Sequence, residues 1–164
     1  MIVMSIAGVD PSGGAGVLTD IKAFQAIGVY GCGIVTALTA QNPYKFFSTM
    51  PVPEEFIEEQ IDSVMDSYDV KFIKTGMLYS PEIIKLVSKK IREYDLKAVV
   101  DPVMVATSGG DLTREDIAKA FNKYLLPLSV LTTPNVSEAE KLADFKINTK
   151  EDAIEASKMI KCNS

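Results

Sequence analysis

A glycine-rich loop near the N-terminus places the tightest constraint on how this chain folds. Residues 8–20 read Gly-Val-Asp-Pro-Ser-Gly-Gly-Ala-Gly-Val-Leu-Thr-Asp, and they stand between an apolar run at residues 1–7 and an amphipathic segment that continues through Ile27. This order predicts a strand, a tight loop and a helix. Glycine backbone can approach a ligand closely, and the free N–H groups at a helix start attract acceptor groups. The loop is therefore typical of a binding site, with an ordinary strand-to-helix turn as the alternative.

The loop matches neither of the two common phosphate-binding patterns. A P-loop requires Gly-Lys-Ser/Thr at its end, whereas Gly13 is followed by Gly14 and no lysine occurs before Lys22. The dinucleotide pattern Gly-x-Gly-x-x-Gly is not met either, because the glycines stand at positions 13, 14 and 16. The loop alone does not name its ligand.

Composition and charge narrow the class of partner. The chain has 164 residues, of which 47% are hydrophobic, and these numbers predict one folded domain with a substantial core. Its formal net charge of −5 disfavours a nucleic-acid surface, which needs clustered lysine and arginine, so we expect a small-molecule ligand. No apolar run approaches the roughly 20 residues of a membrane span, and the N-terminus lacks the basic flank of a signal peptide. We therefore expect no membrane contact and a cytoplasmic location.

The chain contains no histidine, which excludes Ser-His-Asp and Cys-His schemes. Its chemistry must use carboxylates, lysine, backbone dipoles or a metal. The two cysteines, Cys32 and Cys162, stand far apart in sequence and are expected to be free thiols, with Cys32 packed in or near a strand.

Short apolar runs alternate with amphipathic segments along the chain. Beyond the first strand and helix, strands are predicted over residues 32–40, 70–73, 97–100 and 130–133. Helices are predicted over residues 53–68, from Ser80, over 113–126, after Asn135 and over 150–161. Five short strands alternating with helices predict an α/β fold with a mainly parallel sheet, in a single domain over residues 1–164. Because a strand is expected after the last helix, the domain looks incomplete at its C-terminus.

Polar or ligand-type residues follow the C-terminal ends of the predicted strands. They are Asp10, Asp20, Gln41, Met77, Asp101 and Glu138. The carboxyl ends of parallel strands share one edge of the sheet, where ligands bind in open α/β folds. A carboxylate directly after a buried strand, as at Asp101, is costly unless it meets a cation or donors, so Asp101 is a metal or site candidate, with turn capping as the alternative. Glu138, three residues after Asn135, also fits a helix capping box.

Five stretches in order resemble the hydroxymethylpyrimidine/phosphomethylpyrimidine kinase family of the ribokinase-like superfamily. They are residues 5–20, 35–42, 74–77, 101–104 and 133–138, and the resemblance covers the whole chain. It implies a ribokinase-like three-layer sandwich around a mainly parallel sheet. It also implies ATP-dependent phosphorylation of 4-amino-5-hydroxymethyl-2-methylpyrimidine and then of its monophosphate, in thiamine biosynthesis.

The resemblance assigns roles to particular residues. The positions that it implies for pyrimidine binding are Gly8, Asp20, Gln41, Met77 and Val103. Asn135 and Glu138 match the superfamily's Asn-x-x-Glu motif, which orders Mg²⁺ near the nucleotide phosphates, and Asp101 matches an acid of the same region. ATP and Mg²⁺ are thus the implied cofactors, and a homodimer is an assembly that the family often forms.

Part of the family pattern is not found in residues 1–164. The Gly-Thr-Gly anion hole with its catalytic acid or cysteine, a Lys-Gly-Gly segment and most of the adenine site are absent from the sequence. No catalytic residue is therefore expected within residues 1–164, and Cys32 is not the family's active-site cysteine. Should the gene product end at Ser164, we expect no kinase activity, because the transferred phosphoryl group would lack its anion hole.

Two other functions stay open at this point. One is a pyridoxal or pyridoxine kinase, since related enzymes share the fold and phosphorylate a hydroxymethyl group on an aromatic ring. The other is a non-catalytic pyrimidine-binding module. The glycine loop with Asp20 and Gln41 favours the pyrimidine, and the composition of residues 106–111 would permit a lid over the substrate.

Overall fold

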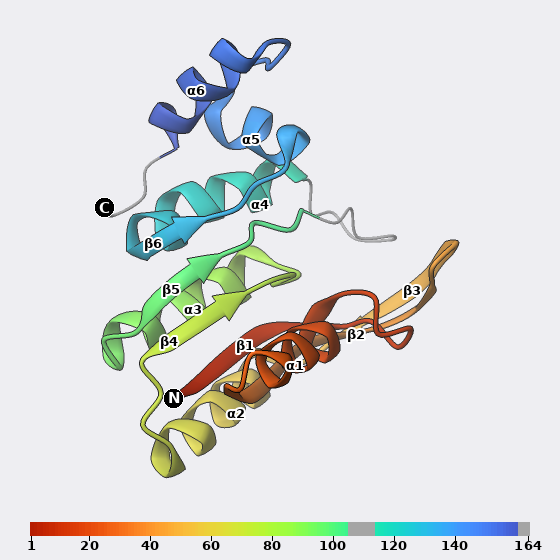
Figure 1. The fold of residues 1–164 in the computed structure, drawn as a ribbon, viewed down its shortest axis with the longest axis vertical. Coiled ribbons are helices and arrows are strands. Elements are labelled where there is room, and N and C mark those ends of the chain that lie inside the picture. Colours follow the sequence, from red (N-terminus) through yellow and green to blue (C-terminus); the bar gives the residue numbers. More distant parts are fainter. Residues whose placement is uncertain (105–113, 161–164) are drawn as a thin grey trace.

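A six-stranded sheet runs through the protein in the order β3-β2-β1-β4-β5-β6 (Figure 1). The computed structural model describes residues 1–104 and 114–160. The strands are β1 (Ile2–Val9), β2 (Tyr30–Asn42), β3 (Lys45–Pro51), β4 (Phe72–Thr75), β5 (Lys97–Val100) and β6 (Ser129–Thr132). Only β3 is antiparallel to its neighbour. The mainly parallel α/β fold predicted from the sequence is confirmed.

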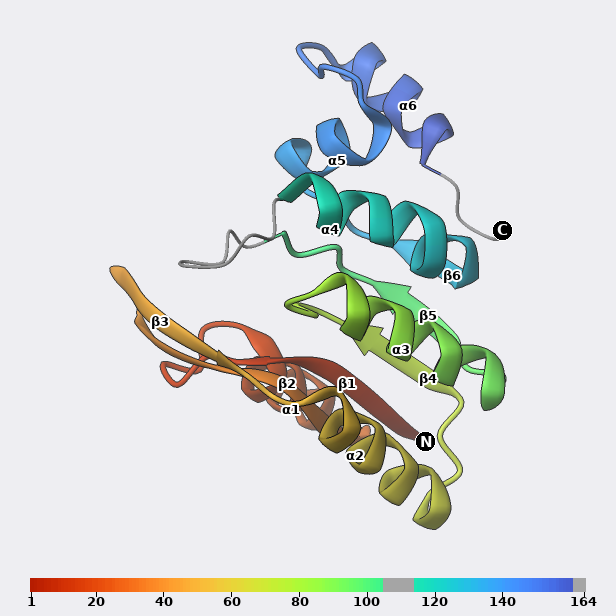
Figure 2. The ribbon, with the colours of Figure 1, turned by 180° about the vertical axis from the view of Figure 1, so that it is seen from behind.

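Helices cover both faces of the sheet. One face carries α1 (Gly16–Ala26), and the other carries α2 (Glu54–Ser67), α3 (Pro81–Glu93) and α4 (Arg114–Ala120) (Figures 1 and 2). A π-helical turn, η1 (Phe121–Leu125), and a 3₁₀ turn, η2 (Leu126–Leu128), continue α4 toward β6. The last helices, α5 (Val136–Ala143) and α6 (Lys150–Met159), pack on each other beyond β6. These layers form the sandwich that the sequence implied.

The central strands are apolar because both of their faces are covered. In β1 every residue from Val3 to Ala7 is buried, and the small Ser5 is the only polar one among them. Such continuous runs are typical of parallel strands between two helical layers. At the start of α3 the side chain of Ser80 accepts the Ile83 N–H at 3.2 Å, with Pro81 in the first helical position, as predicted.

Strand β3 was not predicted from the sequence, and the prediction that Gln41 lies just past the end of a strand was therefore wrong. The last pair between β1 and β2 joins Val9 and Leu38, yet β2 continues to Asn42 because β3 pairs with it on the far side. This pairing bonds the backbone groups of β2 that point away from β1, and it keeps the segment extended beyond the end of β1. Gln41, predicted to lie just past a strand, lies inside β2 opposite Phe46. It still extends beyond the carboxyl end of β1.

Several smaller expectations have clear outcomes. Cys32 is buried in β2 as a free thiol, whereas Cys162 lies outside the described residues. The residue 106–111 loop and the predicted helix start at Thr113 also lie outside them. The last helix ends at Met159 rather than near Lys161. Within residues 1–104 and 114–160, no helix is long and apolar enough to cross a bilayer.

A buried lysine fastens α3 to α2. The Lys90 side chain is 4% exposed, and its ammonium lies 2.7 Å from Asp62 Oδ1, 3.0 Å from Glu58 Oε1 and 3.2 Å from Glu93 Oε2. Burial disfavours the ammonium, but the bonds to these carboxylates outweigh burial and raise the pKa of Lys90. Burial likewise acts against the Asp62 charge, but bonds from Lys90 and Tyr94 prevail and lower the pKa of Asp62.

We predict that Lys90→Met makes the protein less sensitive to acid. Because the pKa of Asp62 is lowered by folding, its contribution to stability is complete above the unfolded-state value of about 3.9 and is lost as pH falls through the lower folded value. Between pH 6 and pH 3, urea unfolding of the native protein should lose about 1 kcal/mol more than that of Lys90→Met.

The control for this prediction is Lys71→Met, because Lys71 pairs with Asp69 at an exposed position. This variant should follow the native pH dependence. An equally steep acid loss in Lys90→Met and in the native protein would contradict the role given to Lys90.

Candidate functional site

A cavity of 180 Å³ opens at the carboxyl ends of the parallel strands. From β1 the chain builds β2 and β3 on one side, and then returns to build β4 and β5 on the other. The loops after β1 and β4 diverge at this point, which is where open α/β sheets bind ligands. Of the residues predicted to form the site, five line this cavity: Gly8, Gln41, Met77, Asp101 and Val103.

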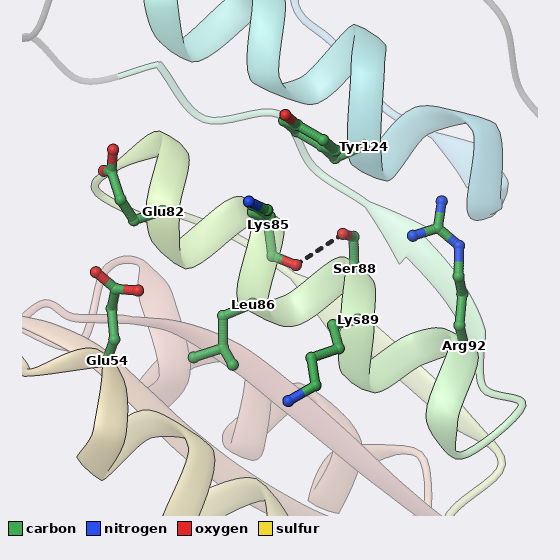
Figure 3. A pocket seen from close by; sticks show the side chains of 8 residues that line it. All are labelled: Glu54, Glu82, Lys85, Leu86, Ser88, Lys89, Arg92 and Tyr124. Atoms are coloured by element: carbon green, nitrogen blue, oxygen red, sulfur yellow. Dashed lines mark hydrogen bonds between the residues drawn. The ribbon is translucent and has the colours of Figure 1, made fainter.

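A larger hollow lies on the helical surface and has a different character. It has a volume of 480 Å³, and its lining comes from α2, α3 and η1 (Figure 3). Lys85, Lys89 and Arg92 line it from one helix, and Lys89 already pairs with Glu58 at 3.0 Å. It contains no residue from a strand end and none of the predicted site residues. The strand-end cavity is therefore the candidate site.

Glycines give the strand-end cavity its slot-like shape. Gly8 is buried near the end of β1, where a Cβ atom would collide with the terminal methyl group of Met77. Gly16 has a φ of 65°, and a Cβ there would collide with the Gly8 carbonyl oxygen. The loop thus folds back directly onto the end of β1 because neither position carries a side chain. Met77 and Val103 supply apolar contacts beside this bare backbone.

Gln41 lines the cavity together with Asp10, a buried carboxylate that was predicted to lie at this edge of the sheet but was given no role in binding. Asp10 Oδ1 accepts bonds from the Ser12 backbone N–H and hydroxyl, both at 2.8 Å. Burial acts to raise the pKa of Asp10, but the bonds from Ser12, Gln41 and Gly14 outweigh burial and lower it. The Gln41 amide is near enough to Asp10 to contribute to this lowered pKa. Its nitrogen is the atom that can donate to a carboxylate, and its carbonyl oxygen can accept from a ligand.

The position of Gln41 is fixed by its strand. The Thr39 hydroxyl donates to the Val9 carbonyl at 2.9 Å, and this bond ties the extension of β2 to the end of β1. Thr39 also lines the cavity. The backbone that carries Gln41 is therefore held on both sides, through the bond from Thr39 to Val9 and through the pairing with β3.

A lysine stands between two carboxylates at the other side of the cavity. Lys74 Nζ lies 3.1 Å from Asp20 Oδ2 and 3.7 Å from Asp101 Oδ2, and Asp20 also accepts the Ser5 hydroxyl. Burial raises the pKa of Asp101, the Lys74 charge opposes this effect, and Asp20 adds to it. Asp20 itself does not line the cavity, although the resemblance implied that it binds the substrate. The structure places it behind Lys74.

The position of Lys74 inside an apolar strand is a sequence signal that could have identified it as a site residue. Lys74 interrupts the apolar strand β4, just as Asp101 follows the apolar strand β5. A charge in a buried strand needs a partner, and the two charges turn out to partner each other. The signal for Asp10 is weaker, because an aspartate in a loop rich in glycine, proline and serine is common in ordinary turns.

Asn135 and Glu138, predicted to bind the nucleotide and the metal, come after β6, the strand that pairs with β5. They do not line the strand-end cavity; they lie at the start of α5. Asn135 Oδ1 accepts the Glu138 N–H at 3.0 Å, and Glu138 Oε2 accepts the Asn135 N–H at 2.9 Å. The capping box that the sequence allowed is therefore present, and it fixes both side chains at the helix start.

The carboxylates suit Mg²⁺ better than a metal that needs a full protein cage. The part of the chain that the structure describes contains no cluster of three metal-ligating side chains. Mg²⁺ keeps several waters and is usually held by one or two carboxylates together with substrate phosphates. Asp101 directly follows β5, and Glu138 lies in the first turn of α5, beyond the neighbouring strand β6, so these are the two carboxylates to consider for such a site.

Comparisons with known proteins agree on one family. The model of the family "Phosphomethylpyrimidine kinase" matches residues 10–163. A hydroxymethylpyrimidine/phosphomethylpyrimidine kinase of Rhizobium meliloti is 46% identical over 138 residues, which cover 84% of this chain and 52% of that protein. The chain thus spans about half the length of this relative.

Solved structures with the same fold include a phosphomethylpyrimidine kinase and a pyridoxal kinase. A phosphomethylpyrimidine kinase of Clostridium difficile superposes with a TM-score of 0.89 at 36% identity, covering 98% of this chain and 72% of that one. A Bacillus subtilis pyridoxal kinase in complex with ADP superposes with a TM-score of 0.88 at 37% identity, covering 97% of this chain and 61% of that one.

We predict that Gly16→Ala damages the fold far more than Gly28→Ala. Both glycines have positive φ, 65° and 75°, so both variants pay the backbone strain of about 1–2 kcal/mol. A Cβ at position 28 meets no atom within 4 Å, whereas one at position 16 meets the Gly8 carbonyl. In urea unfolding we expect Gly16→Ala to lose at least about 2 kcal/mol more than Gly28→Ala. Equal losses would show that the loop moves away from β1 at little cost.

Proposed function

The chain belongs to the phosphomethylpyrimidine kinase family, and we propose that its strand-end cavity binds the aminopyrimidine that the whole enzyme phosphorylates with ATP. The ribokinase-like fold implied by the sequence is confirmed by the solved relatives. The proposed substrates are 4-amino-5-hydroxymethyl-2-methylpyrimidine and then its monophosphate, on the route to thiamine diphosphate. The observation that carries this proposal is that Gln41 and Asp10 line the same cavity as the apolar side chains of Met77 and Val103.

The chemistry of the pair suits an aminopyrimidine. Such a ring presents an amino donor beside a ring-nitrogen acceptor. The Gln41 carbonyl can accept from the amino group, while the second N–H of its amide can donate to the ring nitrogen. Asp10 lines the cavity beside Gln41, and its carboxylate would favour this orientation by accepting the other N–H of the amide. Met77 and Val103 would contact the ring, and the bare backbone at Gly8 would let it lie close to β1.

Asp101 and Glu138 are the residues proposed to hold Mg²⁺, and Asn135 is proposed to bind the nucleotide beside them. The ion would neutralise charge on the nucleotide phosphates during transfer. The contribution of the chain is to keep these groups in place: the capping box fixes Asn135 and Glu138, and Lys74 lies next to Asp101. Their positions follow β5 and β6, next to the proposed pyrimidine site.

Residues 1–164 are proposed to be the substrate-binding portion of a single kinase domain. The chain spans about half of the Rhizobium relative, with 52% of that protein covered. The anion hole and the catalytic residue are accordingly proposed to lie outside residues 1–164, and no turnover is expected from these residues alone. The homodimer and the cytoplasmic location expected from the sequence stay predictions.

A pyridoxal kinase is the second candidate function. The Bacillus subtilis pyridoxal kinase is 37% identical and has nearly the same fold over this chain, which supports the alternative. Pyridoxal, however, has no amino group next to a ring nitrogen, so the double recognition at Gln41 would not be used. A non-catalytic pyrimidine-binding module would use the same cavity, and its affinity would not depend on ATP.

We predict that Gln41→Ala weakens binding of the hydroxymethyl aminopyrimidine by at least about tenfold, because two bonds to the ring are lost. Isothermal titration calorimetry with the 164-residue protein measures this without turnover. Gln25→Ala is the matched control, since Gln25 is exposed on α1 away from the cavity. Unchanged affinity in Gln41→Ala would remove Gln41 from the site, and equal binding of pyridoxal by the native protein would favour the second function.

A further inference from the structure

Lys74 has a special place among the groups that line the strand-end cavity. It is the only basic side chain among the described lining residues, whereas Asp10 and Asp101 both contribute carboxylates. Its side chain is 25% exposed, so the ammonium is partly open to the cavity. The proposed function leaves Lys74 without a role on the substrate.

The ammonium of Lys74 is held in place from several sides. Asp20 Oδ2 accepts from it at 3.1 Å, and Ser5 in turn donates to the same Asp20 oxygen. The Lys74 side chain passes over Gly76, where a Cβ atom would lie 3.2 Å from Nζ. The missing side chain at Gly76 leaves room for the ammonium. Because Asp20 does not line the cavity, its charge acts on a ligand through Lys74. Asp20 is therefore a positioning residue.

Lys74 and Gln41 stand on opposite sides of the cavity. Gln41 belongs to β2 and Lys74 to β4, with β1 between them. Gln41 also lies further along the sheet, because Ser5 pairs with both Lys74 and Gly33, and Gln41 comes well after Gly33 on β2. The Lys74 side chain extends toward the same end of the sheet, where its ammonium lies over Gly76. Because both residues line one cavity, a pyrimidine ring bound at Gln41 can direct a substituent on its opposite side toward Lys74.

The two proposed substrates differ in charge on that side. The hydroxymethyl compound is neutral there, and the monophosphate carries close to two negative charges. The carboxylates of Asp10 and Asp101 would repel the phosphate, and Lys74 is the group placed to offset them. Asp101 lies 3.7 Å from Nζ, beyond ordinary hydrogen-bond length, so the ammonium can still donate to a ligand.

We propose that Lys74, positioned by Asp20 and Gly76, pairs with the phosphate of the aminopyrimidine monophosphate and so allows one cavity to accept both a neutral and an anionic substrate. This inference rests on the proposed function. It assigns recognition of the phosphate to Lys74 on β4 and recognition of the ring to Gln41 on β2.

The test compares the affinities of both compounds by calorimetry on the 164-residue protein. Lys74→Met should weaken the monophosphate by at least about tenfold and change the hydroxymethyl compound by less than about threefold. Lys22→Met is the matched control: Lys22 binds the Gly13 carbonyl at 3.3 Å beside the cavity but does not line it. This control should leave both affinities within about twofold.

A second variant addresses folding, because Lys74→Met alone leaves Asp20 without its cation. Lys74→Met/Asp20→Asn removes both charges, and it should show the same selective loss of the monophosphate. In the native protein, added salt should weaken the monophosphate and leave the hydroxymethyl compound almost unchanged.

The possible outcomes separate the two proposals. Equal weakening of both compounds, or no weakening of the monophosphate in either variant, would overturn the role of Lys74 while the proposed function stands. Failure of the native protein to bind the hydroxymethyl compound at all would instead overturn the proposed function.

Discussion

The close approach of the glycine loop to the end of β1 is the constraint on which the site depends. Gly16 can lie against the Gly8 carbonyl, and Met77 against Gly8, only because these positions have no Cβ atom. Once the loop is folded onto β1, Asp10 is buried and must find donors, which Ser12 supplies at 2.8 Å. Gln41 lines the same cavity, on the part of β2 that is held by β3. Close packing of the backbone therefore fixes the Asp10 carboxylate, and strand pairing places the Gln41 amide in the same cavity.

The buried Lys90 and the partly buried Lys74 show how ion pairing can serve stability or binding. Lys90 is 4% exposed and lies within 3.2 Å of three carboxylates, so its donors are fully used inside the protein. Lys74 is 25% exposed and has one close partner at 3.1 Å and one distant partner at 3.7 Å. The first arrangement joins two helices, and the second leaves a fixed cation with free donor capacity at a cavity.

Much of the fold could be predicted from the sequence, because strands covered on both faces are continuously apolar and stand out between amphipathic helices. β3 could not, since all of its residues except Thr49 are exposed and its pairing depends on β2 extending past β1. At the site, the positions of strand ends and the family resemblance together predicted Gln41, Met77, Asp101 and Val103, and all four line one cavity. Asp20 does not line it, because its place depends on how α1 packs and on the reach of Lys74, which the sequence does not specify.

The comparison of the two hollows explains why the smaller one is the better site. The hollow of 480 Å³ in Figure 3 takes its cations from exposed positions on successive turns of α3, and long side chains there lose conformational entropy when a ligand orders them. The cavity of 180 Å³ takes its polar groups from the ends of four strands, and the side chains of Asp10, Thr39 and Lys74 are already hydrogen-bonded to neighbours. Binding at the strand ends therefore orders little that is not already ordered, so chemical complementarity there converts more directly into affinity.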